Sequence, residues 1–183
     1  MKSLILEASS EHALIADSEG KEVHLLGGPE FSKVLGLEIK GFGSGFERIV
    51  VGAGPGSFTG IRVTAAMGQA LAFGWGIPLF TAPSLSAFAP EDGEGDFAVA
   101  VDAKSGGIYV QRGFEKPILL GLEEAGRLLK AVSLITSPHP AKIVQRLPFL
   151  ASCRWKETRP SARLLERFAV SASEPLQLHY LVL

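Results

Sequence analysis

The hydrophobic and polar positions of this chain form two similar series, one in each half of the sequence. Each series opens with three short apolar runs separated by turn residues, a pattern that predicts an antiparallel meander of strands. Helix-like and strand-like stretches then alternate, as expected for an α/β fold. In the first series we predict strands at 3–8, 12–17, 21–26, 48–53 and 77–82, and helices at 29–37, 60–74 and 83–89.

The second series is shorter and less regular than the first. Its predicted strands span 97–103, 107–113, 116–120, 132–137 and 149–153, and its predicted helices span 122–130 and 161–170. Between the two series lies an acidic, glycine-rich stretch, Glu91 to Asp96, which is typical of a boundary between lobes. We therefore expect two lobes, residues 1–92 and residues 93–183.

Composition and charge exclude several classes of protein. The 183 residues suffice for a real core, and the net charge of −1 provides no overall attraction to nucleic acid or to an anionic membrane. The lone cysteine cannot form an internal disulfide, and the four histidines match no zinc motif, so no metal site is expected. The chain has neither the apolar core of a signal peptide nor a run near the roughly 18 apolar residues of a membrane span. We expect a cytoplasmic protein.

The stretch GAGPGSFTGIR, Gly52 to Arg62, follows a strand-like run and opens a helix, as phosphate-binding loops do. It does not match the Walker pattern, because Ile61 stands where the lysine would be, and it matches neither the dinucleotide pattern nor the hydrolase elbow. Two interpretations remain: a tight turn with a helix cap, or a contact for an anion or nucleotide. The residues concerned are Gly54, Pro55, Gly56, Ser57 and Thr59, with Ser57 or Thr59 as the cap.

The helix that follows has small residues at every fourth position and lacks the broad polar face of a solvent-covered helix. It is therefore either an internal core helix or a helix with one face on its own sheet and the other on a partner. Small side chains allow two helix backbones to approach closely. The candidate interface residues are Gly60, Arg62, Thr64, Met67, Gly68, Leu71 and Ala72.

Two further features carry candidate chemistry. Glu7 and Asp102 end apolar strands, where paired acids can hold a metal or act as acid and base, although such residues also serve as turn and capping groups. From Ala141 to Arg167 there are seven basic and two acidic residues. That segment either contacts RNA phosphates or forms a solvated helical face.

With GPGSFTGIR in view, the chain resembles the TsaB (YeaZ) family of bacterial accessory proteins for tRNA threonylcarbamoyladenosine (t6A) synthesis. LILEASS is similar to the family's I-L-x-x-D-T-S start, and VDAKSGGIY to its D-A-R-x-x-x-V-Y segment. The SARLLERFAV helix near the end also looks similar. The resemblance implies an actin-like (ASKHA, ribonuclease H-like) fold of two βββαβα lobes, the second trimmed, without a working active site.

The resemblance also implies the partners. The paralogue TsaD transfers threonylcarbamoyl to adenosine 37 of ANN-decoding tRNAs, and the TsaB-like protein would bind and activate it through N-terminal-lobe helices. The same surface would form a homodimer in isolation, a TsaE-like ATPase would join, and tRNA would be contacted only within the complex. No cofactor is implied, with ATP or ADP only at an interface shared with partners. The older label of the wider family, glycoprotease, does not fit the histidines.

This chain departs from the family pattern at several positions. Glu7 stands where aspartate is usual, Gly107 replaces a usual glutamate, and the helix from Pro29 lacks the family's R-H-S element. The alternative to a scaffold is a small actin-like nucleotide-binding enzyme that uses the Gly54–Gly60 loop with Glu7 and Asp102.

Overall fold

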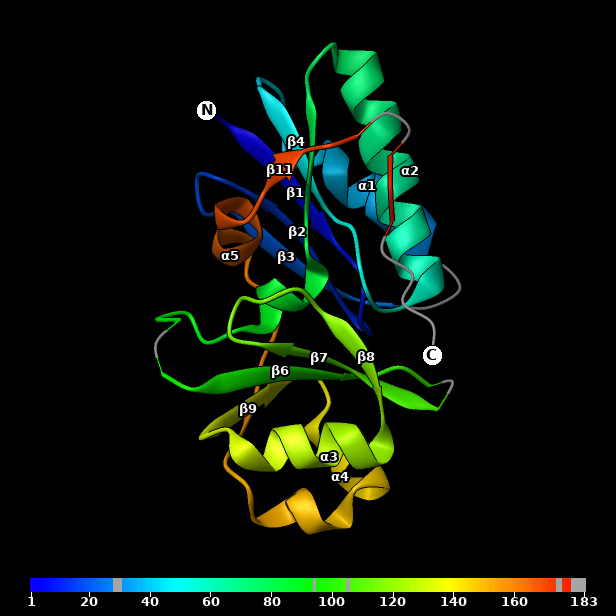
Figure 1. The fold of residues 1–183 in the computed structure, drawn as a ribbon. Coiled ribbons are helices and arrows are strands. Elements are labelled where there is room, and N and C mark those ends of the chain that lie inside the picture. The colour runs from blue at the N-terminus through cyan, green and yellow to red at the C-terminus, as the bar shows by residue number, and fades with distance from the viewer. Residues whose placement is uncertain (28–30, 94, 105, 174–175, 179–183) are drawn as a thin grey trace.

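Two β-sheets, each covered by helices, make up the computed structural model, which describes residues 1–27, 31–93, 95–104, 106–173 and 176–178. The six-stranded first sheet has the order β11-β5-β4-β1-β2-β3, and the five-stranded second sheet has the order β10-β9-β6-β7-β8. Figure 1 shows the first sheet with its helices above the second. This mixed α/β architecture confirms the predicted fold class.

The first sheet is built from a meander followed by parallel strands. The antiparallel meander is β1 (Ser3–Glu7), β2 (His12–Asp17) and β3 (Glu22–Leu26). Strand β4 (Arg48–Gly52) lies parallel to β1, and β5 (Leu79–Ala82) lies parallel to β4. Helix α1 (Phe31–Lys40) precedes β4, and helix α2 (Phe58–Trp75) connects β4 to β5.

The second sheet repeats this βββαβα order. Strands β6 (Phe97–Asp102), β7 (Gly107–Arg112) and β8 (Ile118–Gly121) form its meander. Helix α3 (Leu122–Ala131) leads to β9 (Leu134–Ser137), which is parallel to β6. Helix α4 (Pro140–Arg146) follows, and β10 (Trp155–Glu157) pairs in parallel with β9.

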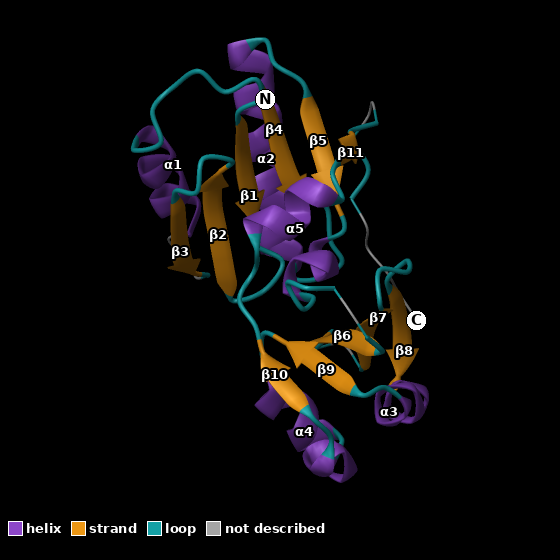
Figure 2. Ribbon diagram, turned by 90° about the vertical axis from the view of Figure 1, so that its left-hand side faces the viewer, coloured by secondary structure: helices purple, strands orange, loops and turns teal. Residues whose placement is uncertain are grey.

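Side chains that alternate along the strands separate three cores. Leu4 and Leu6 of β1 face α1 and α2, whereas Ile5 faces a core shared with the short 3-10 helix η1 (Ser84–Phe88) and helix α5 (Ala162–Arg167). Figure 2 shows α5 on one face of the first sheet, with α2 behind the other. Val99 of β6 also joins the core that contains Ile5, so the two lobes share apolar packing. Helices α3 and α4 cover the far side of the second sheet.

The C-terminal part differs from the prediction. The strand predicted at 149–153 is wrong: residues 149–152 lie in a 3-10 helix, η2 (Pro148–Ser152), which begins at a proline suited to a first helical position. The predicted helix at 161–170 ends at Arg167, and β11 (Val170–Ser171) pairs with β5. The chain therefore returns to the first sheet after completing the second, and the lobe boundary proposed at residues 92/93 does not describe this last strand.

Two smaller points complete the comparison. Helix α1 extends to Lys40 rather than ending near Leu37, and its predicted start at Pro29 lies outside the described residues. Within the described residues no helix has the length and apolarity needed to cross a membrane.

Candidate functional site

The glycine-rich loop between β4 and α2 is packed tightly against the turn that joins β1 to β2. A Cβ added at Gly56, whose φ is +153°, would lie 2.3 Å from the carbonyl oxygen of Ser9, and one added at Gly60 would lie 1.8 Å from that of Ala8. The amide of Ser57 donates a hydrogen bond to the Ser9 carbonyl oxygen at 2.6 Å. Glycine is therefore required here because two backbones meet without room for side chains.

The cap of α2 is Ser57. Its hydroxyl oxygen accepts a hydrogen bond from the amide of Gly60 at 3.5 Å, and helical residues begin at Phe58. Thr59, the other predicted cap, lies inside the helix and is exposed. The turn-and-cap interpretation of this loop is confirmed for Ser57.

Glu7 is fully buried behind this loop. Its carboxylate accepts hydrogen bonds from the Ser9 amide and, at 2.8 Å, from the Ser84 hydroxyl, whose oxygen accepts the Gly54 amide at 2.9 Å. Burial raises the pKa of Glu7, and these hydrogen bonds partly offset that shift. Gly52 leaves room for the carboxylate, since a Cβ there would lie 1.6 Å from Glu7 Oε2. Glu7 thus stabilises the loop from within the core, through the hydrogen bonds that link it to Ser84 and Gly54.

Asp102 is also occupied by its own chain. Its carboxylate forms an ion pair with Arg146 of α4 and accepts the amide of Lys104 at 3.2 Å. Arg146 in addition donates to the Gly107 carbonyl oxygen at 3.1 Å. Asp102 lines the cleft between the lobes and Glu7 does not, so the interpretation of the two as an acid pair does not hold.

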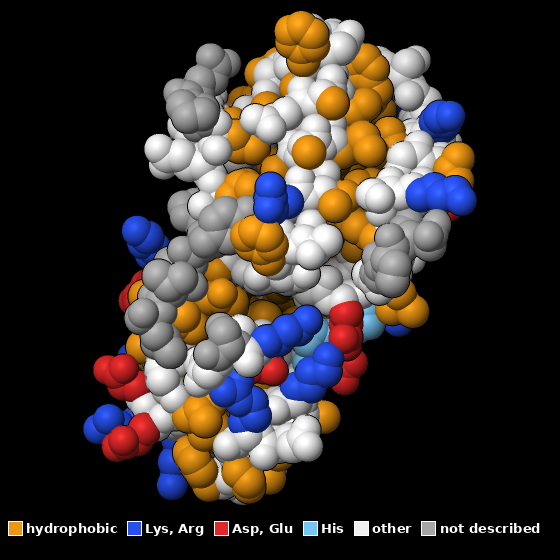
Figure 3. Space-filling view, turned by 90° about the vertical axis from the view of Figure 1, so that its right-hand side faces the viewer, with side chains coloured by type: hydrophobic (Ala, Val, Ile, Leu, Met, Phe, Trp, Pro, Cys, Tyr) orange, Lys and Arg blue, Asp and Glu red, His pale blue; other side chains and the backbone are white. Residues whose placement is uncertain are grey.

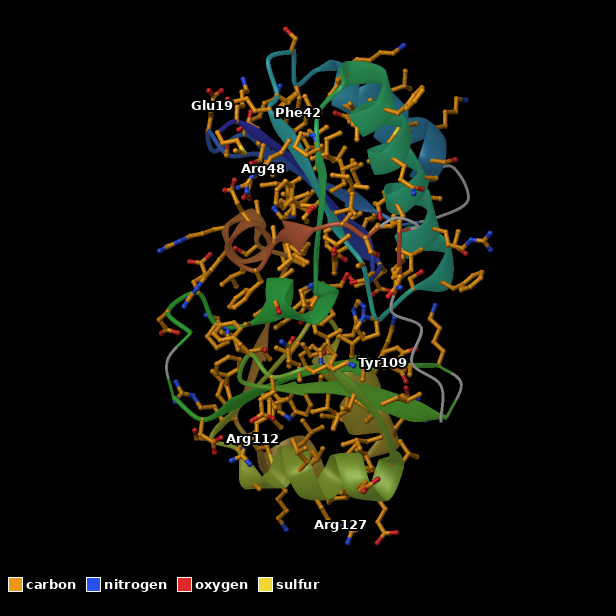
Figure 4. The ribbon with its side chains drawn as sticks, turned by 45° about the horizontal axis from the view of Figure 1, so that its top comes forward. Glu19, Phe42, Arg48, Tyr109, Arg112 and Arg127 are labelled. Atoms are coloured by element: carbon orange, nitrogen blue, oxygen red, sulfur yellow. The ribbon has the colours of Figure 1, made fainter. Side chains whose placement is uncertain are left out.

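That cleft has a volume of about 810 Å³ and is lined by both lobes. It brings together five segments that are far apart in the sequence: the β1–β2 turn, the start of α1, the start of α2, the β6–β7 turn and the start of α4. Tyr109 of β7 lies between the lobes (Figure 4), and burial raises the pKa of its hydroxyl. The polar lining residues are Ser9, Ser10, Glu11, Ser32, Ser57, Thr59, Asp102, Lys104, Tyr109, His139 and Lys142.

The small-residue stripe of α2 faces the chain's own sheet. A Cβ added at Gly68 would lie 2.5 Å from Val51 Cγ1 and 3.3 Å from Leu79 Cδ1. The four members of the stripe are all buried: Gly60, Thr64, Gly68 and Ala72. Their assignment to a partner interface is therefore corrected, because the sheet already occupies the space that they leave.

The opposite face of α2 is open. Helix positions two residues apart point about 200° apart, and Ala66, Ala70 and Gly74 form a second stripe of small residues that is exposed. Phe73 beside it is 92% exposed, and Phe58 is 57% exposed. Figure 3 shows apolar side chains over much of this face of the molecule. Of the other predicted interface residues, Arg62 is exposed, and Met67 and Leu71 are half-buried.

The basic segment at 142–167 does not form one surface. Its basic residues are divided between α4, β10, α5 and the loops on either side of β10, and α4 and α5 cover different sheets. Lys142 pairs with Glu11 at 2.7 Å, Arg146 pairs with Asp102, and Arg167 lies over the Phe114 ring. These cations are directed to partners within the chain.

A cluster that sequence patterns did not reveal lies at the rim of the cleft. His139 Nδ1 is 3.0 Å from Glu11 Oε1, and the His12 and His139 rings have centroids 5.7 Å apart. The hydrogen bond from Lys142 lowers the pKa of Glu11, and burial lowers that of His139. Glu11 and His12 are neighbours in the sequence, but His139 comes from the other lobe, so no local spacing links the three.

Comparison with known proteins agrees with the two-lobed fold. The family model described as "TsaD: tRNA N6-adenosine threonylcarbamoyltransferase" matches residues 43–136, half of the chain, which include the glycine-rich loop and α2. The two-lobed fold and this match together define an actin-like (ASKHA) protein of the TsaD type.

Individual relatives indicate the family more narrowly. The tRNA threonylcarbamoyladenosine biosynthesis protein TsaB of Haemophilus influenzae is 37% identical over 67 residues, which are 34% of this chain and 28% of that protein's length. The solved structure of YeaZ from Pseudomonas aeruginosa has a TM-score of 0.73 at 21% identity, covering 98% of this chain and 99% of the other. A structure described as similar to peptidase YeaZ from Pseudomonas aeruginosa has a TM-score of 0.70 at 19% identity, with 99% of each chain covered. The chain belongs to the TsaB (YeaZ) family.

Proposed function

We propose that the protein acts in t6A biosynthesis as a non-catalytic scaffold that binds and activates a TsaD-like threonylcarbamoyltransferase. The name of the Haemophilus relative and the TsaD family model support a role in this modification. The target would be adenosine 37 of ANN-decoding tRNAs, which implies that the protein acts in the cytoplasm.

The open face of α2 is the observation that carries this proposal. A monomer exposes large apolar side chains together chiefly where another surface covers them. Phe58 and Phe73 stand out from this helix, and Trp75 at its end is 43% exposed. Each such side chain contributes roughly 1.5–3 kcal/mol when it is buried. Between them Ala66 and Ala70 leave room for a second helix to approach.

The internal partners of the two strand-end acids support a scaffold rather than a catalyst. Glu7 is sealed behind the glycine-rich loop, and Asp102 is held by Arg146. Neither carboxylate is poised to accept a proton from a substrate in the cleft or to hold a metal there. The dispersed basic residues fit tRNA contact within a complex rather than by the isolated chain.

The same open face would pair two copies of the chain in isolation. In the complex a TsaD-like helix would replace the second copy, and a TsaE-like ATPase would bind the resulting assembly. Any ATP or ADP would then lie at the shared interface.

The test is size-exclusion chromatography with light scattering, on the protein alone and mixed with TsaD from the same organism. We expect a homodimer that exchanges into a heterodimer. Phe73→Asp should weaken both associations by about 2 kcal/mol or more, roughly thirtyfold. Ile118→Asp is the matched control, because Ile118 is 45% exposed on β8 of the other lobe. If Phe73→Asp associates as the unchanged protein does, α2 is not the interface.

The size of the cleft favours a second candidate, a nucleotide-binding protein. The cleft holds Lys104 and Lys142, and the N-terminus of α2 opens into it. Calorimetric titration with ATP and magnesium chloride tests this candidate directly. Saturable binding that is lost in Lys104→Ala would support it, and the absence of heat at millimolar ATP would remove it.

A further inference from the structure

The rim of the cleft carries three side chains of the types that bind first-row transition metals. One ligand atom from each of Glu11, His12 and His139 can be chosen so that all three lie within 4.8 Å of one another. In a tetrahedral zinc site with bonds of about 2.0–2.1 Å the ligand atoms are roughly 3.3 Å apart. His139 Nδ1 and Glu11 Oε1, at 3.0 Å, already have nearly this separation.

Glu11 is the ligand with the most freedom to make the remaining adjustment. The side chain of Glu11 is 49% exposed, and that of His139 is 12% exposed. Glu11 and His12 lie on the β1–β2 turn and at the start of β2, whereas His139 is the residue before α4. The largely covered imidazole of His139 thus provides a fixed ligand, and rotations of the Glu11 and His12 side chains close the set around an ion.

The surroundings orient these residues toward a shared ion. His139 Nδ1 faces Glu11 Oε1 at 3.0 Å. Lys142 binds the other oxygen of this carboxylate, Oε2, at 2.7 Å, which leaves Oε1 directed at His139. A hydrogen-bonded partner of this kind orients a metal-ligating carboxylate.

We propose that Glu11, His12 and His139 bind one Zn²⁺ ion between the two lobes. Two imidazoles and one carboxylate suit zinc, whereas Ca²⁺ and Mg²⁺ prefer oxygen ligands alone. The ion takes the position now spanned by the His139–Glu11 hydrogen bond, and His139 then carries its proton on Nε2. Because the ligands come from the β1–β2 turn and from the start of α4, the ion ties the lobes together at the mouth of the cleft. Zinc binding at this rim does not depend on the proposed scaffold function.

The experiment uses the full chain, freed of any histidine tag and dialysed against chelator. Calorimetry with zinc chloride should show one saturable site, and zinc should raise the melting temperature. His12→Ala and His139→Ala should each weaken binding at least tenfold and remove the rise in melting temperature. The matched control is His24→Ala, because His24 also lies beside a carboxylate, with Nε2 at 3.4 Å from Glu22 Oε2, but on β3 outside the cleft.

Melting temperatures measured in chelator show whether each variant folds. If His139→Ala does not fold, His12→Ala decides the question, because it removes a different ligand, from the other lobe. Three results would overturn the site: no binding by the unchanged protein, unchanged binding by the double variant His12→Ala/His139→Ala, or an equal loss in His24→Ala.

Discussion

Gly68→Ala tests which face of α2 packs on the first sheet. A Cβ at this position would lie 2.5 Å from Val51 Cγ1 and 3.3 Å from Leu79 Cδ1, so the core must shift to admit it. Overpacking of this kind typically costs about 1–3 kcal/mol. The same change also gains about 0.5–1 kcal/mol of helix propensity. We therefore expect a net loss of unfolding free energy of about 1 kcal/mol.

Gly74→Ala is the matched control, because it lies in the same helix and its added Cβ would meet nothing within 4 Å. It should stabilise the protein by the propensity gain alone, about 0.5–1 kcal/mol. The difference between the two variants then isolates the packing cost. Gly60→Ala should cost more than Gly68→Ala, because its Cβ would meet the backbone carbonyl oxygen of Ala8 at 1.8 Å and no side-chain rotation relieves that contact.

Urea unfolding followed by circular dichroism measures these free energies. Equal stability of Gly68→Ala and Gly74→Ala would refute the close packing of Gly68 against Val51 and Leu79. It would also restore the idea that the Gly68 stripe meets a partner. A folded Gly68→Ala protein should keep the proposed association with TsaD, since the stripe faces the chain's own sheet.

Three further predictions concern charged groups. Glu7→Gln should gain stability relative to the unchanged protein as pH rises. The pKa of Glu7 is raised above the ordinary 4.5, so Glu7 stabilises the fold below pH 4.5 and loses this contribution as it ionises at higher pH. The free energies of unfolding of the two proteins, measured by urea titration, should therefore differ between pH 5 and pH 8. Arg48→Met should cost about 1–3 kcal/mol, because the Glu166 carboxylate, 2.7 Å away, loses its charged partner and keeps the hydrogen bond from the Ser3 hydroxyl. Glu166→Gln in the same chain should recover part of the loss in a double-mutant cycle. Burial lowers the pKa of His139, so the stability that its neutral imidazole contributes to the fold is present above the ordinary pKa of 6.5 and is lost as pH falls. Between pH 7 and pH 5 the melting temperature of His139→Asn should therefore drop less than that of the unchanged protein.

Much of the fold could be predicted from local patterns. The meander strands follow from short apolar runs bounded by turn residues, and α3 begins and ends within one residue of its prediction. The cap at Ser57 follows from the chemistry of a hydroxyl before a helix. These features depend on neighbours within a few residues, which is why periodicity and turn chemistry find them.

The features that the sequence did not predict depend on residues that are far apart in the chain. Helix α2 is apolar on nearly all sides, so its sequence has no clear amphipathic pattern. Such a sequence does not show that the stripe with Gly68 packs on the sheet and that the stripe with Ala70 is exposed. The pairing of β11 with β5 joins residues about ninety positions apart, and the cluster of Glu11, His12 and His139 spans both lobes. Such contacts are set by tertiary packing. The sequence shows which residue types are available but not which of them meet.

The glycine-rich loop shows why a motif can resemble a ligand site and yet serve packing. In a phosphate loop the backbone amides at a helix start point at an anion. In this protein the Ser57 amide is bound by the Ser9 carbonyl oxygen, and the Gly54 amide is bound by Ser84, which in turn holds Glu7. A ligand could use these two amides only by displacing their internal partners. The loop thus fixes the start of α2, the helix on which Phe73 is 92% exposed, against the first hairpin.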